Sequence, residues 1–202
     1  IASLNGEIDY PKPTVPHPVT VGDALSNIPE KDKIYLPPQN DYQKLMSGRP
    51  DILNHNPINH AANIVARMHT VPQGGNWKDI PIELGQGGGV HSNNYRRLKW
   101  DEPSITIKHV SKSMIIHPIY DRTPTIREVA RIQSSDDDFE ILGTIYNQHQ
   151  QLANAVPPLL GKAIATSVYT MNWYLISRRG MSVMLYFFFM NSTTRRHIRS
   201  YF

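Results

Sequence analysis

Cationic side chains flanked by aromatic ones form the strongest candidate binding site in this sequence. Arg96, Arg97 and Lys99 lie between Tyr95 and Trp100. A guanidinium group binds phosphate through paired hydrogen bonds, and it also reads guanine in the major groove of DNA. The cluster therefore predicts a contact with nucleic acid. The alternative is an ordinary edge strand with charged flanks.

A turn with two glycines, at residues 71–81, could serve the same purpose. Glycine permits positive φ and a close approach of the backbone to another surface. With Asn76 and Lys78 beside it, the turn could place a backbone amide and a cation against a phosphate. The alternative is a surface turn with Trp77 packed beneath it.

The charge is distributed unevenly along the chain. The 202 residues carry a net charge of +4, and residues 91–131 alone carry 8 basic and 4 acidic side chains. A basic band of this kind suits a surface that contacts phosphate, although a solvated face gives the same pattern.

The lack of cysteine excludes several kinds of chemistry. Without this residue, the chain cannot form disulfides, cysteine-based zinc sites or a thiol nucleophile. His55, His60 and His69 match no metal-ligand spacing that is associated with a mechanism, so we expect no metal site.

The two ends of the chain give expectations about its context. The first residue is Ile1 and no secretory signal follows it, which suggests a fragment or a processed chain. The apolar run at residues 181–190 is too short to span a membrane, which needs about twenty residues. This run could aggregate, bind a partner as a helix, or be a tail read out of frame.

A helix is predicted at residues 122–133, where Thr125 and Glu128 have the spacing of a capping box. Apolar residues at helical spacing form a stripe along it, and Arg127 and Arg131 lie off that stripe. The pattern also predicts a helix at residues 20–29 capped by Thr20 and Asp23, a helix at 61–68, a helix that starts at the prolines of 154–165, and a strand at 104–108.

Residue identities around the predicted helix resemble a known family. The pattern Arg-x-Pro-Thr-x-Arg-Glu-x-Ala-Arg-Ile-Gln spans residues 122–133, Asp-Asp-Phe occupies 137–139, and Gln-x-x-Asn-Ala-Val-Pro-Pro occupies 151–158. In this order and spacing they resemble the last two conserved motifs of the DNA cytosine-5 methyltransferases, in the C-terminal part of that family only. Ser135 and Asp136 stand where the family usually has Phe and Pro. The structural residues of the motif would be Arg122, Thr125, Arg127 and Glu128.

The resemblance implies roles for particular residues. The glycine turn is similar to a segment found in many bacterial recognition domains. Thr106 and Ile107 match a pair that lies against DNA near the flipped base in the family, and Asn154 and Ala155 match positions near the methionine end of S-adenosylmethionine. The residues expected to contact DNA are Asn76, Lys78, Arg96, Arg97, Lys99, Thr106, Ile107 and Lys108.

The family reaction transfers a methyl group from S-adenosylmethionine to carbon 5 of cytosine. A cysteine thiolate attacks carbon 6, a glutamate assists, and the base flips out of the duplex. This chain has no cysteine and lacks the Pro-Cys and Glu-Asn-Val motifs, so we expect no methyl transfer by the chain alone. It would be the recognition half of a restriction–modification enzyme, in the bacterial cytoplasm with the nucleoid, and would need a separate catalytic half. The alternatives are a non-catalytic DNA-binding module and an inactive truncated remnant.

The resemblance also predicts the fold class. We expect an α+β protein with a small, irregular, β-rich target-recognition domain at residues 21–117 and C-terminal helical motifs at 118–170. In the family those helices pack on a Rossmann-like catalytic domain that uses S-adenosylmethionine, which would be absent here. Residues 1–20 would be the end of a catalytic-domain strand and a proline-rich connector, and 171–202 a divergent tail.

Overall fold

The computed structural model describes residues 10–85 and 94–178, with side chains as far as residue 169. The chain divides into a larger compact unit, residues 13–161, and a second unit that contains residues 1–12 and 162–202. Each unit is described by itself. Two expectations lie outside the described residues: the end of a strand near the N-terminus and the apolar run at 181–190.

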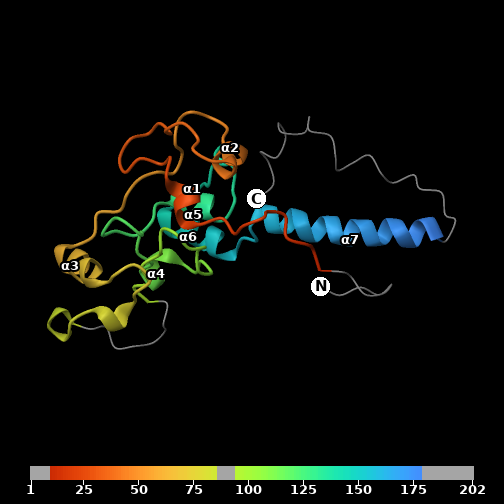
Figure 1. Cartoon of the computed structure of the whole chain (residues 1–202). Coiled ribbons are helices and arrows are strands. Elements are labelled where there is room, and N and C mark those ends of the chain that lie inside the picture. The colour runs from red at the N-terminus through yellow and green to blue at the C-terminus, as the bar shows by residue number, and fades with distance from the viewer. Residues whose placement is uncertain (1–9, 86–93, 179–202) are drawn as a thin grey trace. The chain divides into compact units, whose positions relative to one another are not determined.

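Helices are the regular elements of the described residues (Figure 1). The helices α1 to α6 belong to the larger unit, and α7 begins in it and continues through the second unit. Their bounds are α1 Val21–Leu25, α2 Asp41–Met46, α3 Ala62–Thr70, η1 Trp77–Asp79, η2 Ile82–Leu84, α4 Val110–Ser113, α5 Ile126–Ile132, α6 Ile145–Asn154 and α7 Pro158–Arg178.

The expectation of a β-rich domain is wrong for the described part of the chain, which contains no strand. Its β-pairing is limited to two isolated bridges, Ile34 with Asp51 and Arg97 with Ile116. Residues 104–108 show the expected alternation, because Ile107 is buried while Thr106 and Lys108 are exposed, but they pair with no neighbouring strand. Alternation in a sequence predicts which side chains face the core, and it does not predict whether a second strand lies alongside.

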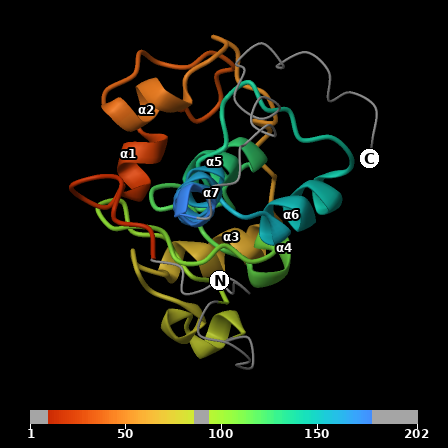
Figure 2. The same ribbon diagram turned by 90° about the vertical axis from the view of Figure 1, so that its right-hand side faces the viewer.

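The main hydrophobic core lies where α5 packs between α1 and α6 (Figures 1 and 2). Val21 and Leu25 of α1, Val129 of α5 and Leu152 of α6 are each buried in it. The boundary expected between residues 117 and 118 falls inside this unit. A second, smaller cluster contains Met68, Val71, Ile80 and Ile116.

The predicted helix starts at α1 and α5 are confirmed. Asp23 N donates to Thr20 Oγ1 at 3.0 Å, and Thr20 N donates to Asp23 Oδ2 at 2.9 Å. At α5, Glu128 N donates to Thr125 Oγ1 at 3.2 Å and Thr125 N donates to Glu128 Oε2 at 2.7 Å. Both capping boxes satisfy amides that a helix start otherwise leaves unpaired.

The last two helices meet at residues 155–157. The helix expected in the region 154–165 begins at Pro158, and Asn154 is the last residue of α6. Leu159 N, in the first turn of α7, donates to Ser134 Oγ at 3.2 Å. Within the described parts of the chain, no helix has the length and apolar character needed to cross a bilayer.

Candidate functional site

The glycine turn and the cationic stretch, which are separate in sequence, lie side by side. Gly74 N donates to Arg97 O at 3.0 Å, and Arg97 N donates to Gly75 O at 3.1 Å. Trp77 N donates to Asn94 O at 3.0 Å. Two of the segments expected to contact DNA are therefore joined by their main chains.

A third segment pairs with the opposite edge of the cationic stretch. Leu98 N donates to Ile116 O at 3.0 Å, Ile116 N donates to Arg96 O at 2.9 Å, and Tyr95 N donates to Ser113 O at 3.0 Å. We call these paired segments, residues 74–77, 94–98 and 113–116, the three-segment layer.

Arg97 is placed differently from the expectation of an exposed cationic cluster. Only 5% of its surface is exposed. Its guanidinium donates to main-chain carbonyls and forms an ion pair with Asp121, with Arg97 Nη2 and Asp121 Oδ1 2.5 Å apart. Because these internal partners occupy its donors, Arg97 does not form a DNA-facing pair with Arg96 in this structure.

Arg96 is the contrasting case. Its side chain is partly exposed, and within the described residues its guanidinium makes no hydrogen bond or ion pair. Every other arginine whose side chain is described has a partner: Arg49, Arg67, Arg97, Arg122, Arg127 and Arg131. Arg96 is thus the described guanidinium that remains available to a ligand such as phosphate.

Lys99 forms an ion pair with Glu102, and its side-chain stem lies next to Gly74, the first glycine of the turn. Its Nζ lies 2.5 Å from Glu102 Oε1. Gly74 has φ +76°, and a Cβ at this position would lie 2.4 Å from Lys99 Cε. The left-handed backbone favours glycine here, and a Cβ would in addition force the side chain of Lys99 to move.

Asn76 and Lys78 lie at the short helix η1. Asn76 Oδ1 accepts from Lys78 N at 3.0 Å and Asn76 N donates to Asp79 Oδ2 at 2.7 Å, so the asparagine caps this helix. Lys78 is exposed, with its Nζ 5.9 Å from the centroid of the Trp77 ring. Trp77 is partly buried against the smaller core cluster, as the alternative interpretation of this turn expects.

Residues 106–108 divide between surface and interior. Ile107 is 7% exposed and belongs to the main core, whereas Thr106 and Lys108 are exposed. The exposed or partly exposed members of the expected DNA-contacting set are therefore Asn76, Lys78, Arg96, Lys99, Thr106 and Lys108.

The motif residues at the start of α5 form a buried polar cluster. Arg122 Nη1 and Nη2 donate to Glu128 Oε2 and Oε1, both at 2.8 Å. Burial alone would raise the pKa of Glu128, but the hydrogen bonds from Arg122 lower it below its ordinary value. His117 Nε2 lies 3.7 Å from Glu128 Oε1, and burial lowers the pKa of His117 to about 4.

His55 supports the same helix start from a distant part of the sequence. Its Nε2 donates to Pro29 O at 2.8 Å, and its Nδ1 lies 2.9 Å from Thr125 Oγ1. Burial lowers the pKa of His55. In the neutral ring Nε2 carries the proton, so Nδ1 accepts a hydrogen bond from the hydroxyl of Thr125. The sequence predicts that His55 is no metal ligand, but no local pattern indicates this buried role, because Pro29 and Thr125 lie 26 and 70 positions away.

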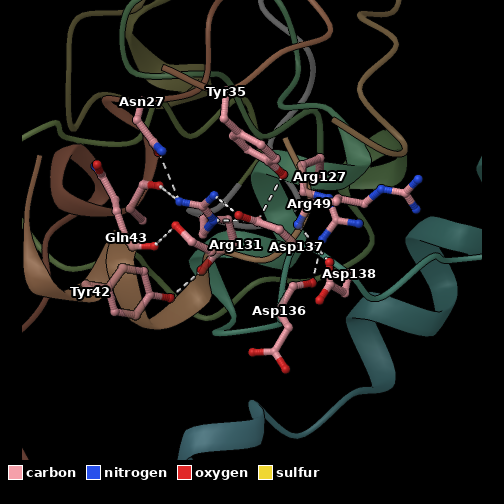
Figure 3. Close-up of polar contacts among 12 residues, drawn as sticks. Asn27, Tyr35, Tyr42, Gln43, Arg49, Arg127, Arg131, Asp136, Asp137 and Asp138 are labelled. Carbon is pink, nitrogen blue, oxygen red and sulfur yellow. Dashed lines mark hydrogen bonds and ion pairs between the residues drawn. The ribbon is translucent and has the colours of Figure 1, made fainter. Parts of the chain in front are cut away.

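Two arginines of α5 lie in the interior, although they fall off the apolar stripe (Figure 3). Arg131 Nε donates to Asp137 Oδ1 at 2.9 Å and Arg131 Nη1 donates to Asn27 Oδ1 at 3.0 Å. Tyr35 also donates to Asp137 Oδ1, at 2.9 Å. Asp137 belongs to the Asp-Asp-Phe motif, but no local pattern marks Asn27 or Tyr35 as its partners.

Arg127 holds the turn that contains the departures from the family pattern. Its guanidinium donates to Leu53 O at 3.0 Å, Asp136 O at 2.9 Å and Phe139 O at 2.5 Å. These acceptors are main-chain atoms, so the turn forms although Ser135 and Asp136 replace the usual residues.

Asn154 and Ala155 are exposed, and Asn154 Oδ1 accepts from Gln150 Nε2 at 3.0 Å. Neither residue lines the pockets of about 220 and 210 Å³ that lie among other described residues. The two exposed residues do not by themselves enclose a ligand.

Comparison with known proteins identifies the family. The profile of the C-5 cytosine-specific DNA methylase family matches residues 4–170. This chain belongs to the C-5 cytosine-specific DNA methylase family. The matched range includes both residues 21–117 and residues 118–170, so one family profile spans the two expected parts.

Two curated members of the methylase family show how much of a relative this chain covers. It is 38% identical over 168 residues to type II methyltransferase M1.HphI of Haemophilus parahaemolyticus, a match that covers 83% of this chain and 41% of that protein. It is 34% identical over 128 residues to type II methyltransferase M.AquIB of a Picosynechococcus strain, which covers 58% of this chain and 87% of that protein. The chain thus spans less than half of one relative and matches most of another.

A solved structure supports the fold. A crystal structure of a proposed DNA modification methyltransferase encoded within a prophage of E. coli aligns with a TM-score of 0.58 and 20% sequence identity. The alignment covers 79% of this chain and 49% of that one. The chain therefore shares its fold with about half of that protein.

Proposed function

We propose that this chain recognises DNA as the C-terminal part of a DNA cytosine-5 methyltransferase that acts on a short duplex target. The observation that carries the proposal is the main-chain pairing of the glycine turn with the stretch that contains Arg96. This pairing places an uncommitted guanidinium beside the turn with Lys78, and the exposed Thr106 and Lys108 add further polar groups. Cations of this kind supply the phosphate contacts on which DNA affinity depends.

The proposal includes a division of labour. The thiolate that attacks cytosine in the family reaction has no counterpart in this cysteine-free chain. We therefore place the nucleophile on a complementary catalytic half. The match to 87% of M.AquIB supports this view, because it shows a protein called a type II methyltransferase that consists mainly of the corresponding part.

S-adenosylmethionine would be held mostly by the catalytic half. Asn154 and Ala155 are exposed and lie outside the lining of the pockets of about 220 and 210 Å³, so alone they do not make a complete cofactor site. We propose that they supply one edge of a pocket that the other half completes.

Methyl transfer with radiolabelled S-adenosylmethionine and duplex DNA tests the proposal. Three samples are compared: this chain, a polypeptide with the Pro-Cys and Glu-Asn-Val motifs, and the mixture. We expect methylation only in the mixture. Methylation by this chain alone would overturn the division of labour, and failure of every mixture would favour an inactive remnant.

A second candidate function is a non-catalytic DNA-binding module. The free guanidinium of Arg96 favours it, because that group needs no catalytic half to bind phosphate. This candidate predicts salt-dependent and sequence-selective binding by the chain alone. Binding that appears only in the presence of the catalytic half would reject it.

A further inference from the structure

One buried arginine, Arg97, contacts both the end of α3 and the start of the glycine turn. Arg97 Nη2 donates to Met68 O at 2.6 Å, in the last turns of α3, and Arg97 Nε donates to Val71 O at 2.7 Å, where the turn begins. Its Nη1 donates to His117 O at 3.1 Å and Tyr120 O at 3.3 Å. The side chain therefore ties the base of the turn to the segment that follows the three-segment layer.

The main chain of the same residue holds the tip of the turn. Gly74 N donates to Arg97 O, and Arg97 N donates to Gly75 O. The base and the tip are thus fixed relative to one residue, and its sequence neighbour is Arg96, the guanidinium available to DNA. A shift of Arg97 would move the turn and Arg96 relative to each other.

A carboxylate keeps the guanidinium in place. Asp121 Oδ1 lies 2.5 Å from Arg97 Nη2, and Asp121 Oδ2 lies 2.8 Å from His69 Nδ1. Burial opposes the charged form of Asp121, but the hydrogen bonds from His69 and Arg97 lower the pKa of Asp121. The carboxylate therefore stays ionised at neutral pH and balances the buried cation.

We propose that Arg97 is a positioning residue for DNA recognition: it fixes the glycine turn against Arg96, and so determines which DNA sequences the chain prefers. This inference rests on the proposed function, because it assumes that the three-segment layer contacts DNA. A lysine at this position would keep the charge, but one ammonium cannot replace a planar fork that reaches acceptors on several segments.

Amide hydrogen exchange on the full chain tests the positioning directly. In Arg97→Lys we expect the amides of Gly74 and Trp77 to exchange about tenfold faster or more, since a charged hydrogen-bond network is lost. The amide of Ser26, which donates to Gly22 O at 2.9 Å in α1, should change far less. Equal acceleration at both places would show a general loss of stability and overturn the inference.

The matched control is Arg127→Lys. Arg127 is also buried and also donates to three main-chain carbonyls, but these belong to other segments. In this variant, the exchange rates of the Gly74 and Trp77 amides, each divided by the rate of the Ser26 amide, should be the same as in the wild-type chain. If Arg97→Lys does not fold, Asp121→Asn provides a second variant: the side chain of Asp121 is 31% exposed, so water partly compensates for the lost charge, and the same two amides should exchange faster.

Selection of bound duplexes from a random library tests the consequence for recognition. We expect Arg97→Lys to retain binding but to select a broader set of sequences, whereas Arg127→Lys selects the wild-type set. A smaller folded fraction lowers binding to all sequences equally, so it cannot broaden the selected set. If the turn is looser in Arg97→Lys but the variant selects the same DNA sequences as the wild-type chain, the inference about Arg97 is overturned and the proposed function stands. If the wild-type chain selects no DNA sequences, with or without a catalytic half, the proposed function is overturned as well.

Discussion

Arg122 and Glu128 face each other at the start of α5 through two parallel hydrogen bonds of 2.8 Å, and both residues are buried. The glutamate also accepts from Thr125 N at 2.7 Å, so one carboxylate closes the capping box and neutralises the arginine. Glu128 therefore both caps the start of α5 and holds the buried guanidinium of Arg122 inside the larger unit.

Replacement of Glu128 by Gln should lower the free energy of unfolding by about 3–5 kcal/mol, because it leaves the guanidinium of Arg122 without a balancing charge in the interior. Chemical denaturation monitored by circular dichroism measures the change. Asp41→Asn is the control, since Asp41 pairs with Lys44 at the surface, where an ion pair contributes at most about 1 kcal/mol. Equal losses in the two variants would contradict the role assigned to the buried pair.

Stability should rise with pH between about 4 and 6.5. Burial lowers the pKa of both His117 and His149 from 6.5 to about 4. In this window the unfolded chain binds protons that the folded chain does not. The free energy of unfolding therefore increases as the pH rises from about 4 to 6.5 and decreases as the pH falls. Denaturation curves measured across this range report the slope.

The variant for this test is His149→Gln, because His149 Nδ1 lies 2.7 Å from Ser111 Oγ and glutamine can retain a hydrogen bond there. It should flatten the slope by about 1 kcal/mol per pH unit in the steepest part. Asn147→Ala changes an exposed residue of α6 that carries no titratable side chain and should leave the slope unchanged. A slope unaltered by His149→Gln would show that another group is responsible.

Replacement of Gly74 by Ala should destabilise the chain by about 1–2 kcal/mol, since a side chain disfavours the left-handed backbone and would collide with Lys99. The control is Gly161→Ala in α7, where the nearest atom to the new Cβ would be Val156 Cγ1 at 4.0 Å. That change should be neutral or stabilising by up to about 1 kcal/mol. Thermal unfolding distinguishes the two, and a neutral Gly74→Ala would argue against the packed turn.

Replacement of Arg96 by Ala should weaken DNA binding and reduce the slope of log affinity against log salt by about 1, as expected for the loss of one phosphate contact. Titrations of a fluorescent duplex at several salt concentrations measure both quantities. The control, Arg49→Ala, removes an exposed arginine that pairs with Asp51 and has no expected DNA contact. An identical slope for wild type and Arg96→Ala would remove Arg96 from the interface.

Local features were predictable because their signals lie within a few residues. The capping boxes at Thr20 and Thr125 formed as predicted, since each depends on a partner three positions away. The strand expected at residues 104–108 did not form, because β-pairing needs a second segment that no short pattern can supply. The burial of Arg97 could not be predicted from the sequence either, because the carbonyl groups that accept its hydrogen bonds lie at least twenty positions away along the chain.

The sequence by itself determined the family and the helix starts, through ordered motifs and short-range capping pairs. The tertiary structure alone decided which arginines are free. Arg96 and Arg97 are adjacent and chemically identical, yet one is partly exposed without a partner among the described residues and the other is buried among carbonyls. The reason is physical: burial of a guanidinium is tolerated only where the folded chain brings distant acceptors and a balancing charge around it.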